Sequence, residues 1–106
     1  MALSAEVIND LHIIKSTGKL KTYEAFFAFK NELETFIPNI LSSDDPILRL
    51  YFVQAFPISS YVLGYILKLR NIDKVRIEII VDDLRLFMFF DEVDMVDEFK
   101  IKIMEM

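Results

Sequence analysis

Side chains that commonly do chemistry in proteins are sparse in this chain, which has a single histidine, His12, and no cysteine. Nucleophilic catalysis needs a nucleophile next to a base, with a third group that orients the base. Here Ser59 or Ser60 would have to lie near His12, and nothing in the sequence brings them together. Gly18 and Gly64 are isolated, so they form no phosphate-binding loop. We therefore predict no catalytic residue and no enzymatic activity.

The densest set of ionisable side chains lies near the C-terminus, where five carboxylates fall within eight residues: Asp91, Glu92, Asp94, Asp97 and Glu98. Clustered carboxylates bind hard cations such as calcium. An EF-hand loop, however, also needs a central glycine and a glutamate at its twelfth position, and both are missing here. The sequence favours a solvated loop, with a docking surface for a basic protein as the alternative. It predicts no metal site and no cofactor.

Composition indicates one small domain spanning residues 1–106. The hydrophobic fraction is 54%, with ten Phe, which is more than a lone domain needs and favours apolar contact between subunits. The net charge is −5, and all of this excess falls within residues 71–106. An acidic chain is a poor partner for phosphate, so we expect no nucleic acid partner. Low glycine beside abundant Ile, Phe, Lys and Asp makes a virus- or plasmid-encoded protein one hypothesis for its origin.

One uncharged stretch, residues 50–67, requires a membrane test. A spanning helix needs about 20 predominantly apolar residues, whereas this stretch of 18 contains Gln54 and is broken by Pro57. We predict a buried helical hairpin here and no membrane partner. The N-terminus shows no secretion-type segment, so a cytoplasmic location is expected.

Helical spacing of apolar residues predicts four helices within residues 4–70, at about 4–16, 22–36, 46–55 and 60–70. Gly18, Pro38 and Pro57 separate them. Tyr23 and Phe27 lie off the apolar face of the second helix. Exposed aromatic side chains favour contact with a partner, so both residues are candidates for a protein interface.

Residues 74–90 alternate apolar and polar side chains on both sides of Asp82 and Asp83, which predicts a β-hairpin. Residues 99–104 predict a third strand with the same alternation. The sequence therefore predicts an α+β fold. Four helices are followed by a three-stranded antiparallel sheet within residues 74–104, and the helices cover its Ile77 and Ile79 face.

The opposite face of that predicted sheet would carry large apolar residues among charges: Ile80, Phe87, Phe89 and Met104. A monomer rarely leaves such a patch in water, so we expect it to form a homodimer interface.

Together these features favour a small acidic protein without enzymatic activity that acts through protein–protein contacts. An inhibitor, an immunity protein or an accessory subunit would fit, most simply as a homodimer. The alternative comes from element order alone, which resembles that of winged-helix DNA-binding domains and implies a DNA-binding regulator. Asp82 and Asp83 at the supposed wing tip would repel phosphate, which weighs against that alternative.

Overall fold

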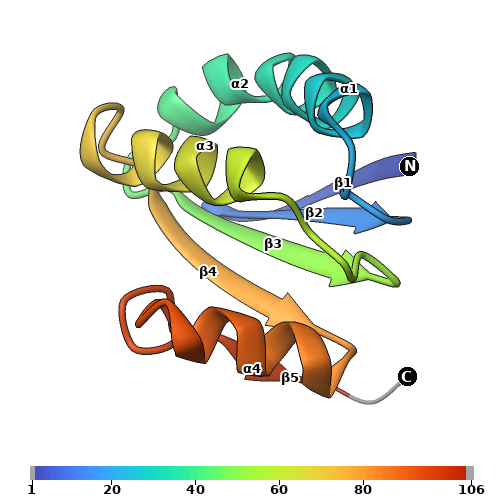
Figure 1. The fold of residues 1–106 in the computed structure, drawn as a ribbon. Helices are drawn as coiled ribbons and strands as arrows, with labels where there is room; N and C mark the ends of the chain where they lie inside the picture. The colour runs from blue at the N-terminus through green and yellow to red at the C-terminus, as the bar shows by residue number, and fades with distance from the viewer. Residues whose placement is uncertain (1, 105–106) are drawn as a thin grey trace.

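The computed structural model describes residues 2–104, and this part of the chain folds into a five-stranded mixed β-sheet with four helices (Figure 1). The elements follow in the order β1 (Ala2–Ile8), β2 (Leu11–Thr17), α1 (Tyr23–Glu34), α2 (Ile37–Leu41), β3 (Ile47–Val53), α3 (Ser60–Asn71), β4 (Arg76–Val81), α4 (Leu84–Glu92) and β5 (Lys102–Ile103). The α+β class is confirmed. The predicted arrangement of helices before a three-stranded antiparallel sheet is wrong.

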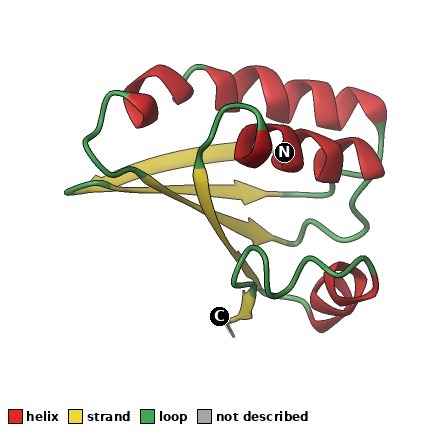
Figure 2. Ribbon diagram, turned by 90° about the vertical axis from the view of Figure 1, so that its left-hand side faces the viewer, coloured by secondary structure: helices red, strands yellow, loops and turns green. Residues whose placement is uncertain are grey.

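The strands lie side by side in the order in which they occur in the chain, from β1 to β5. Strands β1 and β2 form an antiparallel hairpin, and every later neighbour pairs in parallel. Each parallel connection steps across the sheet in the same direction. Since such crossovers are right-handed, all helices belong on one face. Phe52 of β3 confirms this, because its ring contacts both Phe29 of α1 and Phe90 of α4. The twist of the sheet turns α4 away from the other helices (Figures 1 and 2).

The strand register builds the core on the helix-covered face. Ile14, Leu50 and Ile79 lie side by side across β2, β3 and β4, and each is at most 1% exposed. Ile77 and Ile79 face the helices, as the sequence predicted. Within residues 2–104, no helix covers the other face, and there Arg49 of β3 forms an ion pair with Glu78 of β4 at 2.9 Å.

The predicted first helix, residues 4–16, is in fact the β1–β2 hairpin. Its turn lies at Asn9 and Asp10, and Asn9 takes a positive φ of 54°, which asparagine tolerates better than most residues. In β2, His12, Ile14 and Ser16 are buried at every second position. The spacing of the apolar residues in this segment is compatible with a helix as well as with a strand. The segment forms a strand because its backbone pairs with β3.

The predicted hairpin at residues 74–90 is half right. Its first half is strand β4, but the second half is helix α4. Leu86 and Phe90 are one helical turn apart and fully buried, whereas Leu84 and Met88 are 60% and 54% exposed. Residues four apart share one face in a strand and in a helix alike, so the alternation after Asp83 led to the wrong prediction of a strand. Because this hairpin is absent, the element order on which the winged-helix resemblance rested is wrong.

The predicted third helix is strand β3, the middle strand of the sheet. Parallel strands inside a sheet commonly read as largely apolar runs, and ILRLYFV is apolar except for Arg49. The uncharged stretch at 50–67 is therefore divided between β3, a loop and α3, and is no helical hairpin. Among residues 2–104, no helix is long and apolar enough to cross a membrane. The predicted last strand shrinks to Lys102–Ile103 and pairs in parallel with β4.

Candidate functional site

The N-terminal ends of helices α1 and α3 lie side by side at the edge where β2 and β3 end. The loop before α1 is joined to the loop before α3 by a β-bridge between Leu20 and Ile58. The backbone N–H of Ser59 donates to the carbonyl of Leu20 at 2.8 Å, and the N–H of Leu20 donates to Ala55 at 3.3 Å. These bonds fix the first turns of both helices relative to each other.

Three aromatic side chains project from this junction, namely Tyr23, Phe27 and Tyr61, which we call the aromatic surface. Their exposed fractions are 53%, 48% and 56%. Tyr23 and Tyr61 meet edge to face with ring centroids 5.2 Å apart, and Tyr23 stacks on Phe27 at 6.1 Å. Phe26 lies beneath, buried and stacked on Tyr61 at 5.6 Å. The contacts hold the exposed rings in place on a buried support.

Local sequence explains why these rings face outward. Thr22 caps α1 by accepting a hydrogen bond from the N–H of Ala25 at 3.1 Å, so the helix begins at Tyr23. The residues of α1 that turn toward the sheet are Phe26, Phe29 and Leu33. Tyr23 and Phe27, four residues apart, therefore share the neighbouring face of the helix.

The surroundings of the aromatic surface are partly cationic. Lys19 and Lys21 flank Leu20 in the bridged loop and are exposed, and neither forms an ion pair within residues 2–104. The aligned N–H groups at the starts of two helices add partial positive charge at the same edge. An acidic residue, Glu24, also lies here, in the first turn of α1. The rim of the surface thus suits acidic groups.

The predicted homodimer patch is only partly assembled. Ile80 and Met104 do lie together on the helix-free face, where they line a hollow of about 170 Å³ with Arg49, Glu78, Lys100 and Lys102. Ile80 is, however, only 8% exposed. Phe87 and Phe89 belong to α4, where two residues apart means about 200° around the helix axis. Both are half-buried, so the single patch predicted from a hairpin does not exist.

The five acidic residues predicted as one loop are divided, since Asp91 and Glu92 form the end of α4 and the other three follow it. All five are exposed: Asp91, Glu92, Asp94, Asp97 and Glu98. Met95 and Phe99, 4% and 0% exposed, anchor this segment in the core and turn the carboxylates outward. Glu98 reaches Arg70 at 3.4 Å. Within residues 2–104, no group of three or more His, Cys, Asp or Glu side chains could hold a metal ion.

The lone histidine does not meet the serines considered with it. The strand register pairs His12 with Leu48 at the beginning of β3, whereas Ser59 follows the end of that strand. His12 is buried, and its Nε2 lies 2.9 Å from the hydroxyl of Ser43. The structure therefore offers a hydrogen-bonded core histidine in place of a catalytic pair with Ser59 or Ser60.

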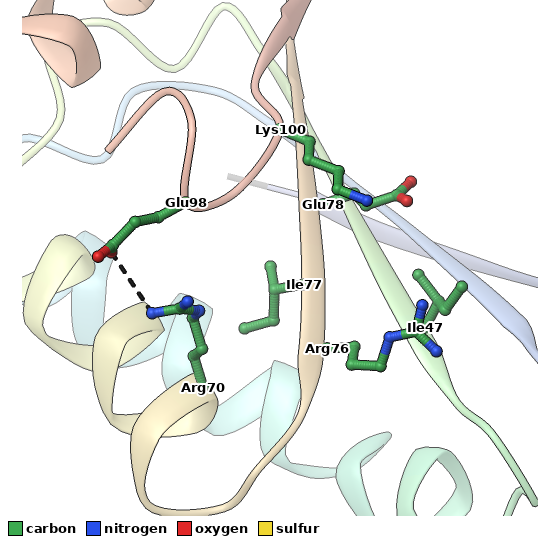
Figure 3. A pocket seen from close by; sticks show the side chains of 7 residues that line it. All are labelled: Ile47, Arg70, Arg76, Ile77, Glu78, Glu98 and Lys100. Atoms are coloured by element: carbon green, nitrogen blue, oxygen red, sulfur yellow. Dashed lines mark hydrogen bonds and ion pairs between the residues drawn. The ribbon is translucent and has the colours of Figure 1, made fainter. Parts of the chain in front are cut away.

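A second hollow, of about 140 Å³, is lined by three basic residues and is shown in Figure 3. Arg70 is held by Glu98 at 3.4 Å, and Arg76 binds Asp45 at 2.7 Å. Ile77 lies between the two arginines (Figure 3). Since both guanidinium groups already face carboxylates, this hollow has little unbalanced charge for an anionic ligand.

Sequence reasoning identified Tyr23 and Phe27 but missed Tyr61, the third member of the aromatic surface. The signal was present, because Tyr61 lies off the face formed by Val62, Leu63 and Ile66. Its place beside Tyr23 depends on the bridge between Leu20 and Ile58, which joins residues far apart in the chain.

Comparison of the chain with protein-family models, with curated proteins and with solved structures found no match.

Proposed function

We propose that this protein is a non-enzymatic interaction module that binds a protein partner through the aromatic surface of Tyr23, Phe27 and Tyr61. The observation that carries the proposal is that the ring of Tyr23 contacts the rings of Phe27 and Tyr61 while each of the three remains about half exposed. Isolated apolar residues on a surface are ordinary, whereas a contiguous aromatic patch is typical of an interface.

Binding energy at protein interfaces concentrates in a few aromatic anchors near the centre of the contact. Tyr23 and Tyr61 are suited to this role because their rings are already packed against each other and against Phe26. Binding would then cost little additional side-chain entropy. The proposed surface is thus organised before the partner arrives.

The partner that fits is a protein segment with apolar side chains bordered by acidic groups. The apolar part would cover the aromatic surface, and the acidic part would face Lys19, Lys21 and the two helix N-termini. Complementary charge of this kind chiefly raises the association rate and the specificity. We therefore expect binding to weaken as the salt concentration rises.

A paired capture experiment tests the proposal. One variant removes the aromatic surface by Tyr23→Ser, Phe27→Ser and Tyr61→Ser. The matched control removes equally exposed apolar side chains elsewhere, by Ile72→Ser, Met88→Ser and Val93→Ser, whose parent residues are 70%, 54% and 43% exposed. Both variants and the parent are immobilised, and the proteins retained from the native host are compared by mass spectrometry.

We expect the parent and the control to retain at least one protein that contains an apolar segment bordered by acidic residues. The aromatic variant should not retain that protein. Binding of that protein, once purified, should also fall on Lys19→Glu with Lys21→Glu. Equal losses in the aromatic variant and in the control would contradict the proposal, since the contact would then be nonspecific adhesion. Circular dichroism of all variants establishes that each remains folded.

A further inference from the structure

One edge of the sheet is long, and nothing within residues 2–104 pairs with it. The strand order places β1 at one edge and the two-residue strand β5 at the other. Proteins usually protect edge strands by making them short or bulged or by adding lysine or proline, because unpaired backbone groups pair readily with another strand. Strand β1 has none of these protections. Its seven residues pair with β2 without a bulge, and Glu6 is its only charged residue.

We propose that β1 pairs in an antiparallel manner with β1 of a second copy of this chain, so that two sheets join into one across a two-fold axis. This surface is separate from the aromatic surface, and its occupant is the protein itself. It is also distinct from the homodimer patch that the sequence predicted, of which the structure brings together only Ile80 and Met104 among the described residues.

The sequence of β1 is complementary to itself in one register. An axis through Ala5 places Ser4 opposite Glu6 of the second copy and Leu3 opposite Val7, and it pairs the whole strand. Moving the axis to Glu6 would shorten the overlap and set the two Glu6 carboxylates opposite each other. Like charges opposite each other destabilise a strand pair, so the register centred on Ala5 is favoured.

Charge complementarity supports the same register. In the β1–β2 hairpin, Lys15 lies opposite Ser4, on the helix-free face. Across the axis, Ser4 would in turn neighbour Glu6 of the second copy, so the small Ser4 separates a lysine from a glutamate. Strands lie about 4.8 Å apart, which places the two backbones about 9.6 Å apart and lets the long side chains meet over Ser4. Within residues 2–104, neither Lys15 nor Glu6 forms an ion pair, and the two-fold axis would supply two.

Apolar contacts across the two-fold axis also favour the register centred on Ala5. Val7 is 59% exposed, and on the helix-covered face it would lie against Leu3 of the second copy, which already packs on the core. Ile8 is 49% exposed and would lie against Ala2 on the other face. The pairing thus removes from water two of the more exposed apolar side chains of the chain and extends the core across the axis.

Light scattering coupled to size-exclusion chromatography tests the proposal with the untagged 106-residue chain, over a series of concentrations. The parent should dimerise as the concentration rises. Glu6→Lys alone and Lys15→Glu alone should each weaken the dimer by at least about fivefold, since each removes two ion pairs and introduces repulsion. The combined variant, with both changes, should recover most of the parent affinity.

Two variants with the same charge changes at exposed residues away from β1, Glu92→Lys and Lys74→Glu, serve as controls and should dimerise as the parent does. Hydrogen exchange gives a readout independent of variants. The backbone amides of residues 2–8 should exchange more slowly as the concentration rises. A parent that stays monomeric at all concentrations would overturn the proposal. So would a dimer whose affinity the combined variant fails to restore, or one in which β1 amides remain unprotected.

Discussion

The ring of Tyr23 meets the ring of Tyr61 edge-on, with 5.2 Å between the centroids and 82° between the planes. One residue begins α1 and the other lies in the first turn of α3, so the contact joins two helices that are separated in the chain by strand β3. Both rings are also more than half exposed. The pair therefore belongs to a surface, and its energetic role should differ from that of the core aromatic residues beneath it.

Replacing Tyr61 should affect stability much less than replacing Phe26 next to it. Tyr61→Ala removes a surface aromatic contact, for which we expect a loss of about 1 kcal/mol in the free energy of unfolding. Phe26 is 9% exposed, and Phe26→Ala should cost about 3 kcal/mol because a cavity forms. Urea unfolding measures both. Equal losses would mean that Tyr61 is a core residue and the aromatic surface is misassigned.

Tyr65 should make the protein less stable in alkali. Burial raises the pKa of its hydroxyl, and the charges of Glu34 and Asp73 raise it further. In the unfolded chain a tyrosine loses its proton at about pH 10, whereas folded Tyr65 keeps it. The folded state then binds more protons, so stability falls as the pH rises above about 10.

Tyr65→Phe should remove this part of the pH dependence. At neutral pH the change should alter stability by no more than about 1 kcal/mol, because the buried hydroxyl lies close to Glu34 but makes no hydrogen bond of good geometry within the described residues. Urea unfolding at neutral and alkaline pH distinguishes the outcomes. A marked loss of stability at neutral pH would show that the hydroxyl has a partner that stabilises the fold.

Asp83 should stabilise α4 and lose that role in acid. Its carboxylate accepts hydrogen bonds from the side chain of Arg85 at 2.7 Å and from its backbone N–H at 2.8 Å, and chiefly the side-chain bond lowers the pKa of Asp83. The stabilisation is present above the unfolded aspartate pKa of about 3.9 and is lost as the pH falls through the lower folded value.

Asp83→Ala, which removes this helix cap, should cost about 1 kcal/mol near neutral pH. Asp83→Asn should preserve more of the capping, because asparagine is also a good cap, but it should flatten the dependence of stability on acid pH. Thermal unfolding at a series of pH values measures the effect. Parallel curves for the parent and Asp83→Asn would indicate that the pairing with Arg85 does not hold in solution.

The acidic segment after α4 should divide into dispensable carboxylates and essential apolar anchors. Asp94→Asn with Asp97→Asn should change stability by less than about 0.5 kcal/mol, because both side chains are exposed. Phe99→Ala should cost at least about 3 kcal/mol, because Phe99 is fully buried beneath Arg70. A large rise in melting temperature on adding calcium would instead reveal a bound ion.

The sequence predicted some elements well because their local signals were unambiguous. Helices α1 and α3 begin within one residue of the starts predicted at about 22 and 60, and the alternation in β4 was correctly read as a strand. The same alternation failed after Asp83, because Leu86 and Phe90 satisfy a strand and a helix alike. In this segment the helix is favoured because Phe90 packs against Phe52, a residue distant in the chain.

The N-terminal hairpin and β3 were missed for a related reason. Ile47–Val53 is a short run that is apolar except for Arg49, and periodicity alone does not separate a buried strand from a buried helix. Of the candidate interface, Tyr23 and Phe27 followed from helical position, whereas the link to Tyr61 needed the bridge between Leu20 and Ile58. Local sequence patterns predict whether a side chain is exposed more readily than they predict which residues of other elements lie next to it.

Hydrogen–deuterium exchange of this chain, alone and bound to the partner recovered in the capture experiment, tests the aromatic surface most directly. Binding through that surface should slow exchange in residues 20–27 and 58–62, which carry the aromatic rings and the bridged loops, and should leave residues 91–98 unchanged. Protection confined to residues 91–98 or to the helix-free face of the sheet, with residues 20–27 and 58–62 exchanging as in the free protein, would contradict the account.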